Sequence, residues 1–394
     1  MLRRLIELAG VFLKLGSISF GGPAAHLAMM DDEVVGRRGW LDRKRFLDLV
    51  AATNLIPGPN AVEMASHVGY LRAGLLGTLV AGCAFTLPAT LIAIVCAWGY
   101  EQYGTLPAVE APLSGIKAAV LAVILAAVYR LGKAALRNWQ LGLVAAGVVA
   151  ASLTEQDEIL VLLAGSLAGV LLLWGCRPNG SGGRAGPAAA LLPGATLATS
   201  LGAAGKAAAG GIVGGVSLGS LFLFFLKVGL VFFGGGYVLV AYIEGGLVGQ
   251  YGFSQQQLLD AVAIGQLTPG PMLSTVTFVG YLVGGGVAGA AVATAGILLP
   301  SFFLVVATNP LIPRLRQSRW AGRFLDAVVA AALGLMAAVT IKLAAATLLA
   351  SSAPLRLEWR GVLVAAVAAA VALRWKVAPA WLVLGGAAAG WILY

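Results

Sequence analysis

The sequence predicts an all-α polytopic membrane protein built from two inverted-topology repeats, with broken or re-entrant helices and about ten spanning helices. Three observations lead to this fold class. Of the 394 residues, 60% are hydrophobic and only 11% are charged, whereas a soluble domain carries about 25% charged residues. Several apolar blocks are long enough to cross a hydrocarbon core of roughly 30 Å. The two halves of the chain also repeat one set of lysine, glycine and proline motifs.

Charge and cysteine content exclude other classes of protein. Lys and Arg number 26 and Asp and Glu 16, which gives a formal charge of +10. The basic residues stand in short loops between apolar blocks, where they orient a membrane protein rather than bind nucleic acid. Three cysteines without CxxC spacing and two histidines predict no disulfide framework, metal site or cofactor. No cleavage site follows the first apolar run, so a removed signal peptide is not expected.

The apolar blocks give the order of the membrane helices. The clearest block, 73–100, contains no charged residue and, at about 1.5 Å per residue, crosses the membrane. The stretch 176–216 is rich in Gly, Ala, Pro and Ser, which is typical of a flexible linker. It separates an N-terminal repeat, 1–175, from a C-terminal repeat, 217–394. The other predicted blocks are 113–131, 139–153, 159–175, 284–307, 327–350, 361–373 and 379–394.

The internal repeat is the most informative feature of the sequence. The motif Phe12-Leu-Lys-Leu-Gly16 recurs as Phe225-Leu-Lys-Val-Gly229, 213 positions later. The Pro-Gly-Pro motif at 57–59 recurs at 269–271, 212 positions later. At the same shift Arg130 corresponds to Lys342, so the repeat extends through at least four apolar blocks.

The positive-inside rule predicts that the two repeats are inverted. The loop 37–45 holds five basic residues and 130–137 holds three, whereas 101–110 is acidic. Basic loops remain in the cytoplasm, so block 73–100 runs outward. Its repeat partner ends at the basic stretch 314–323 and runs inward. This arrangement requires five crossings in each half plus one Pro-Gly-Pro element that enters and returns on the same side.

Lys14 and Lys227 are the first candidate site residues. Lys14 lies about ten residues beyond Arg4, roughly 15 Å into a helix and near the bilayer centre. A charge at that depth is costly and normally faces a water-filled cavity or a partner. Because the lysine recurs in both halves, we expect it to bind a transported anion. Snorkelling, or an ion pair with Glu244 or Glu63, is the alternative.

Glycines and a proline that break helices follow the two lysines, and the two Pro-Gly-Pro motifs form further turns. Unwound backbone has free N–H groups, and half-helix N-termini favour anions, so we expect these breaks to hold an oxyanion. A plain kink or a re-entrant hairpin is the alternative. The predicted binding residues in the breaks are Gly21, Gly22, Pro23, Gly234, Gly235 and Gly236, and those in the turns are Pro57, Gly58, Pro59, Pro269, Gly270 and Pro271.

Polar side chains flank the two Pro-Gly-Pro turns. Asn54 and Gln266 precede the turns at matched positions, and Thr268 lies beside the second turn. We predict that these side chains donate hydrogen bonds to the anion. Helix packing by small polar residues is the alternative.

Two acids and a histidine suggest proton coupling. Glu63 and His67 are four residues apart, so on a helix they share one face and can hydrogen-bond and titrate as a pair. With Glu244 they are the predicted proton-coupling residues. Asp48 and Asp260 also recur, near the start of the element before each turn, where stabilisation of a helix N-terminus accounts for them.

The motifs spread along nearly the whole chain form one set. They are Phe12–Gly16, Phe20–Pro23 with His26, Arg38-Gly-Trp40, Asn54–Asn60 running on to Glu63 and His67, Gly234–Tyr237 and Gln266–Pro271. This set resembles the long, two-domain form of the chromate ion transporter family. The resemblance implies a multi-pass carrier of the bacterial inner membrane that expels chromate and confers chromate resistance. It also adds His26 and Asn60 to the predicted substrate-binding residues.

The predicted function is therefore export of chromate, a tetrahedral oxyanion, by alternating access between two inverted repeats. Uptake or exchange of sulfate, an anion of the same charge and nearly the same shape, is the alternative. An enzyme is not predicted, since no carboxylate pair, GxSxG or HExxH constellation appears at the expected depth in the membrane, and the missing P-loop excludes an ATP-driven pump. The expected partners are the anion and the lipid bilayer. Protons and a homodimer are left open, and no nucleic acid is expected.

Overall fold

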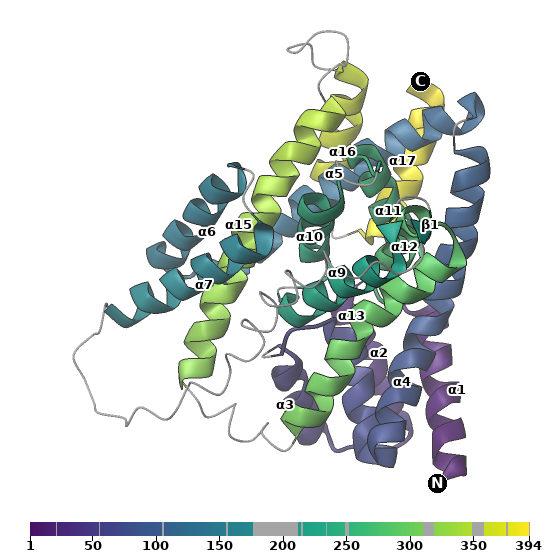
Figure 1. Cartoon of the computed structure of the whole chain (residues 1–394), viewed down its shortest axis with the longest axis vertical. Helices are drawn as coiled ribbons and strands as arrows, with labels where there is room; N and C mark the ends of the chain where they lie inside the picture. Colours follow the sequence, from purple (N-terminus) through teal and green to yellow (C-terminus); the bar gives the residue numbers. More distant parts are fainter. Residues whose placement is uncertain are drawn as a thin grey trace.

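The computed structural model describes nearly all of the chain outside the predicted linker. Gly21, Gly234 and all of the linker except 212–213 and 216 lie outside the described part. Helices make up almost all of that part (Figure 1), and one short antiparallel pair, β1 (Ile212–Val213) and β2 (Val216–Ser217), precedes α9. The described residues are 1–20, 22–54, 56–104, 106–154, 157–175, 212–213, 216–233, 235–248, 252–309, 319–348, 358–375 and 377–393.

The helices follow the order that the apolar blocks predict. The first half contains α1 (Leu2–Ile18), α2 (Pro23–Met30), the π-helix η1 (Asp31–Arg37), α3 (Arg43–Thr53), α4 (Asn60–Tyr103), α5 (Pro107–Ala135), α6 (Trp139–Ser152) and α7 (Glu158–Gly175). The second half contains α9 (Leu218–Val231), α10 (Val238–Leu247), α11 (Gln255–Leu267), α12 (Ser274–Val283), α13 (Val287–Thr308), α15 (Arg319–Leu348), α16 (Trp359–Trp375) and α17 (Pro379–Leu393).

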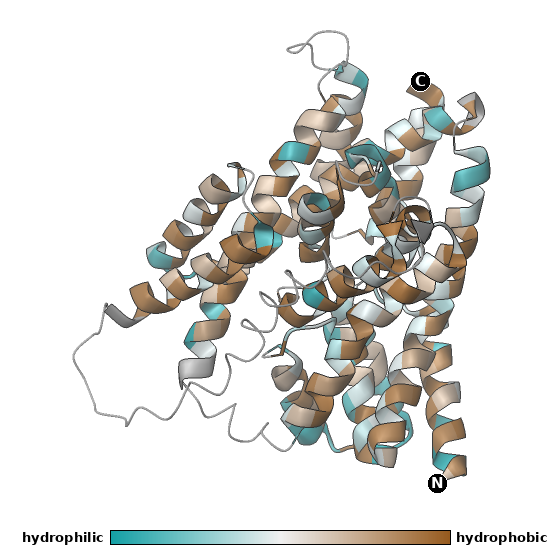
Figure 2. Cartoon of the chain, in the orientation of Figure 1, coloured by the Kyte–Doolittle hydropathy of each residue, from teal (hydrophilic) through white to brown (hydrophobic). Residues whose placement is uncertain are grey.

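Within the described part of the chain, four helices are long and apolar enough to cross a membrane: 60–103, 109–135, 287–308 and 322–348. Hydrophobic residues predominate along the helices in Figure 2. Large apolar side chains such as Val95 and Phe303 are exposed, at 65% and 70%, which is the surface that a lipid environment favours. The prediction of an all-α polytopic membrane protein is confirmed.

Glycine breaks one long helix in each half at matched positions. Within α4 the backbone departs from helical geometry at Ala73 and Gly74, where Gly74 has φ +63°. In the second half α13 begins after Gly286, 212 positions later, which has φ +104°. Residues other than glycine rarely adopt such angles. The sequence therefore specifies the same break twice.

Helices of one half pack against helices of the other, so the two halves do not form separate units. Helix α5 of the first half packs against α16 and α17 of the second, and α15 packs against α6 and α7. Small residues permit this close approach, since a Cβ added at Gly115 of α5 would lie 2.1 Å from the Gly386 carbonyl oxygen of α17. The interface between the halves therefore runs through the core of the molecule.

Candidate functional site

Each half has a break in the chain after the helix that carries its lysine. Helix α1 ends at Ile18, Ser19 is extended, and Gly22, with φ +84°, precedes Pro23, the first residue of α2. Proline favours the first turn of a helix because it has no N–H group to leave unpaired. In the second half α9 ends at Val231 and α10 begins at Val238. Gly21 and Gly234 lie outside the described residues.

The Pro-Gly-Pro turn of each half is hydrogen-bonded to the break of the other half. The Gly58 N–H donates to the Phe232 carbonyl oxygen at 2.8 Å, and the Gly270 N–H donates to the Ser19 carbonyl oxygen at 2.7 Å. Ser19 and Phe232 are 213 positions apart and Gly58 and Gly270 are 212 apart, so the two bonds are equivalent under the repeat. From the sequence, these two amides are expected to be free for an anion. In this structure they are not, because each bonds a carbonyl that the opposite break leaves unpaired.

Buried polar side chains surround this crossing of turns and breaks. A Cβ added at Gly58 would lie 2.1 Å from Glu63 Oε1 and 2.6 Å from Ser301 Oγ, so the α4 carboxyl and the α13 hydroxyl both lie close to the turn. Leaving a buried polar group unpaired costs about 1–3 kcal/mol, which makes a cluster of such groups a candidate site for a ligand, water or proton. Side chains in the described region that are buried here without a hydrogen-bond partner are Ser19, Glu63, Ser274, Thr275 and Ser301.

Glu63 and His67 do not form the hydrogen-bonded pair that their spacing predicts. His67 Nδ1 instead lies 3.0 Å from Asn309 Nδ2, at the end of α13, and Glu63 has no partner among the described residues. The spacing places both residues on α4, but each side chain faces a different neighbour. His26 is also buried, with its ring edge-on to Phe85 at 5.7 Å.

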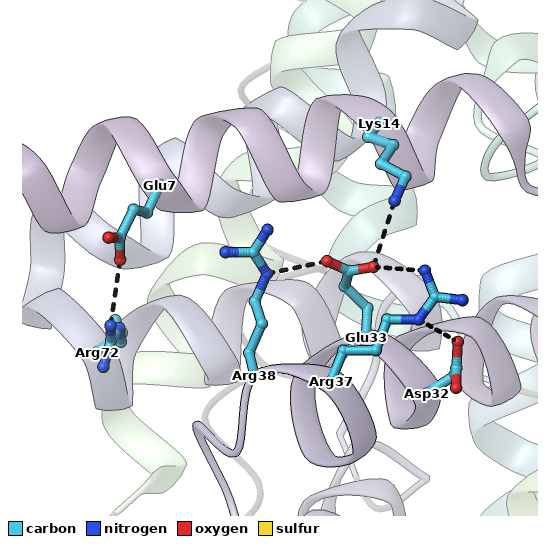
Figure 3. Close-up of polar contacts among 7 residues, drawn as sticks. All are labelled: Glu7, Lys14, Asp32, Glu33, Arg37, Arg38 and Arg72. Carbon is cyan, nitrogen blue, oxygen red and sulfur yellow. Dashed lines mark hydrogen bonds and ion pairs between the residues drawn. The ribbon is translucent and has the colours of Figure 1, made fainter.

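Lys14 belongs to a cluster of charges around Glu33 (Figure 3). Glu33 Oε2 lies 3.4 Å from Lys14 Nζ and 3.8 Å from Arg37 Nη1, and Glu33 Oε1 accepts from Arg38 Nε at 2.9 Å. Arg37 also pairs with Asp32 at 3.0 Å. Three cations thus face two carboxylates, which leaves one positive charge in excess. The Lys14 side chain is 52% exposed, so an anion can approach it.

The motif Arg38-Gly-Trp40 holds this cluster in place. Gly39 has φ +59°, which turns the chain so that the Trp40 N–H donates to the Val34 carbonyl oxygen at 2.9 Å. The Arg38 and Arg72 guanidinium carbons lie 5.2 and 4.7 Å from the centre of the Trp40 ring, within the range of cation–π attraction. The hydrogen bond from Arg38, with a smaller contribution from Lys14, holds the pKa of the Glu33 carboxyl below its ordinary value, so this carboxyl is ionised at neutral pH.

Lys227 lies in a different environment from Lys14. It lines a cavity of about 570 Å³ together with Asp157, Glu158, Glu244 and Lys342. Its Nζ atom is 3.5 Å from Asp157 Oδ2, and Lys342 Nζ is 3.2 Å from Glu244 Oε2. Both lysines of the repeat are therefore paired with carboxylates. The partners are Glu33 and Asp157, so the alternative pairing with Glu244 or Glu63 is wrong in its choice of acids.

The polar residues that flank the two Pro-Gly-Pro turns form hydrogen bonds close to their own turn. Asn60 Nδ2 donates to Asn54 Oδ1 at 2.8 Å on an exposed face. Gln266 accepts from the Tyr237 hydroxyl at 3.4 Å, and the Thr268 hydroxyl donates to the Ile264 carbonyl oxygen of its own helix. These bonds stabilise the segments that flank the turns.

Asp260 does not lie at a helix N-terminus as the sequence analysis expects. It lies in the middle of α11, 1% exposed, and accepts from the Tyr100 hydroxyl at 2.8 Å. Lys117 Nζ of α5 is 3.6 Å from the same carboxylate. Asp260 therefore joins α4, α5 and α11 across the interface between the halves.

Comparison with known proteins identifies the family. One family model, described as chromate transporter, matches the chain twice, over residues 6–170 and 219–391. The chain belongs to the chromate transporter family. The two matched segments contain both lysines, both breaks and both Pro-Gly-Pro turns.

Two relatives named as chromate transport proteins align with this chain over most of its length. A chromate transport protein of Pseudomonas aeruginosa is 32% identical over 391 residues, which cover 98% of this chain and 92% of that protein. A chromate transport protein of Cupriavidus metallidurans is also 32% identical, over 86% of this chain and 82% of its own. An uncharacterized transporter of Bacillus subtilis aligns over 38% of this chain but 85% of its own length. No solved structure is significantly similar to the chain.

Several residues of the charged sites in this chromate transporter family member were not identified from the sequence. Glu33 stands in an acidic run, 31–33, between the first break and the basic loop 37–45. Asp157 stands in the acidic stretch before α7, and Lys342 occupies the position that corresponds to Arg130. Acids close to a break, and a basic residue kept at a repeat-matched position, are the signals that could have identified them.

Proposed function

We propose that this protein is a secondary transporter that exports chromate across the bacterial inner membrane and so confers chromate resistance. The observation that carries the proposal is the Glu33 cluster, in which Lys14 is half exposed and one positive charge is in excess beside the break after α1. A tetrahedral dianion is attracted to such a site. Family membership and the names of the relatives, which are called chromate transport proteins, favour chromate over sulfate.

In this proposal the anion exchanges with protein carboxylates as partner of the two lysines. Glu33 pairs with Lys14 and Asp157 pairs with Lys227, with distances of 3.4 and 3.5 Å between the lysine Nζ and the carboxylate oxygen. Both distances are long for charge-assisted hydrogen bonds. A dianion that binds a lysine thus replaces the carboxylate that pairs with it. The lysine is therefore paired both before and after the anion binds, and no unpaired cation remains in the membrane. Buried hydroxyl groups where the turns meet the breaks supply hydrogen-bond donors along the proposed path of the anion. They belong to Ser19, Ser274, Thr275 and Ser301.

Two equivalent contacts between the halves support alternating access. The bonds from Gly58 to Phe232 and from Gly270 to Ser19 are equivalent under the repeat, so in this proposal one opens while the other stays closed. Two such states are what a carrier with inverted repeats requires. In Figure 1, α3 lies in the lower part of the molecule and its repeat partner α11 in the upper part, as inversion requires.

Labelled chromate in sealed vesicles tests the proposed function. Inside-out membrane vesicles that contain the protein are expected to accumulate chromate faster than vesicles without it, and accumulation should rise when a membrane potential or a pH gradient is imposed. Labelled sulfate in the same vesicles tests the alternative. Accumulation of sulfate without accumulation of chromate would reject chromate export in favour of sulfate transport.

The inverted topology has its own test, because the repeat provides a matched pair of exposed positions. Lys44 in α3 and Gln256 in α11 are 212 positions apart, and both are exposed. In a background whose native cysteines are replaced by serine, Lys44→Cys should be shielded from an impermeant thiol reagent in intact cells, and Gln256→Cys should react. Both positions should react in permeabilised cells. Equal labelling of the two positions in intact cells would contradict the inversion.

A further inference from the structure

The cavity beside Lys227 contains one carboxylate more than its cations can pair. Lys227 pairs with Asp157 and Lys342 pairs with Glu244. Glu158 is the remaining charged residue of the lining. It is 8% exposed, and within the described part of the chain no ion pair or side-chain hydrogen bond from a neighbouring residue reaches its carboxyl group. A buried carboxylate without a cation is unfavourable unless a proton or a ligand neutralises it.

The position of this carboxyl is determined by a glycine on the other half of the protein. A Cβ added at Gly245 of α10 would lie 1.6 Å from Glu158 Cδ and 1.8 and 1.9 Å from its two oxygens. The carboxyl of α7 therefore packs directly on the α10 backbone, where only glycine leaves room for it. Because α7 belongs to the first half and α10 to the second, Glu158 lies at an interface that alternating access would move.

The groups that face Glu158, the first residue of α7, come from the residue before it and from three other helices. They are Asp157, which directly precedes α7, Lys227 on α9, Tyr242 and Glu244 on α10, and Lys342 on α15. Helix α6 also packs on α7, but none of its described residues lines the cavity. With all acids ionised the cavity has one net negative charge, which repels a dianion. One added proton makes it neutral and leaves both lysines able to attract the anion.

We propose that Glu158 is a proton-binding site coupled to anion transport. The inference rests on the proposed transport function and adds a co-transported ion to it. The Glu158 carboxylate takes a proton from hydronium in the water of the cavity, which forms one O–H bond and leaves a water molecule. The carboxylic acid returns the proton to water when the cavity opens to the other side. No electron is transferred, and no other bond changes.

Flux measurements on the full-length protein in proteoliposomes test this site. The quantity to compare is the ratio of chromate flux with an imposed pH gradient to flux without it. We expect this ratio to exceed 1 in the wild type and to fall to 1 in Glu158→Gln. The exposed carboxylate Glu110 provides the control, so Glu110→Gln should keep the wild-type ratio. A wild-type ratio in Glu158→Gln would overturn the proposal.

A second variant and a second readout keep the site testable if Glu158→Gln fails to fold. Gly245→Ala changes no titratable group but displaces the Glu158 carboxyl, so it should also change the pH-gradient ratio. Infrared difference spectra measured as the pH is lowered should show a protonated carboxyl band in the wild type that is lost in Glu158→Gln. That band reports proton binding even if no chromate is transported, which separates failure of the proton site from failure of the proposed function. An unchanged band in Glu158→Gln would reject Glu158 as the site.

Discussion

Replacing Lys14 by alanine is expected to reduce chromate transport by roughly 10- to 100-fold, and replacing Lys227 by alanine should have an effect of similar size. A hydrogen bond to a charged group contributes about 1.5–3 kcal/mol, and each 1.4 kcal/mol is about tenfold in binding. A dianion in a medium of low dielectric constant depends on these charges more than it would in water. The measurement is the initial rate of chromate uptake into inside-out vesicles at equal protein content.

Folding and insertion should survive both substitutions. Without Lys14, Glu33 keeps its contacts with Arg38 and Arg37. Without Lys227, Asp157 is 47% exposed and can be hydrated. The exposed residue Lys133 is the control, so Lys133→Ala should transport normally. Lys14→Arg keeps the charge and should retain more activity than Lys14→Ala. Near-normal transport in both alanine variants would remove the lysines from the site.

The helix order could be predicted because membrane helices are specified by local composition. Each predicted block overlaps a described helix, and block 284–307 ends within one residue of the end of α13, at Thr308. The 212-residue shift of the repeat also relates two breaks that only the structure reveals, at Gly74 and Gly286. Periodicity and composition act within one segment, so they are visible in a single sequence.

The partners of the charged residues could not be predicted, because pairing depends on tertiary packing. Lys14 and Glu33 are 19 positions apart, and Lys227 and Asp157 are 70 apart on different halves. The sequence suggests that each lysine needs a counter-charge, but several acids satisfy that condition. Only the tertiary structure, which places Glu33 of η1 beside Lys14 and Asp157 beside Lys227, decides which acid it is.

The hydrogen bonds between the halves could not be predicted for a related reason. A repeat shows that Gly58 corresponds to Gly270 and Ser19 to Phe232. It does not show whether a turn bonds the break of its own half or that of the other half. Both arrangements have the same local sequence requirements, and the difference lies in tertiary packing between the halves, where α4 packs against α12 and α13. The expectation of free amides at the turns considers each helix end by itself. It leaves out the hydrogen bond from each turn to the break of the other half.

Replacing Gly58 by valine is expected to reduce chromate transport by about 100-fold, since displacing a site by about 1 Å can have an effect of that size. Gly58 has φ +148°, and an added Cβ would lie 2.1 Å from Glu63 Oε1. The side chain must therefore move the turn or the carboxyl. Gly270, with φ +93°, is less crowded, since its first contact is the Gly16 carbonyl oxygen at 3.0 Å. Gly270→Val should therefore have the smaller effect of the two.

The comparison that matters is between transport and stability in the same variants. Strained backbone costs about 1–3 kcal/mol, so both valine variants should still fold, with a lower melting temperature in detergent. Gly10→Val is the control, because a Cβ at Gly10 meets no atom within 4 Å. Replacing Pro57 by alanine should be milder, because the bond from Gly58 to Phe232 still holds the turn. If folded Gly58→Val and Gly270→Val proteins bind and transport chromate like the parent, the turns are structural kinks, and the breaks that follow Lys14 and Lys227 remain as the site of the anion.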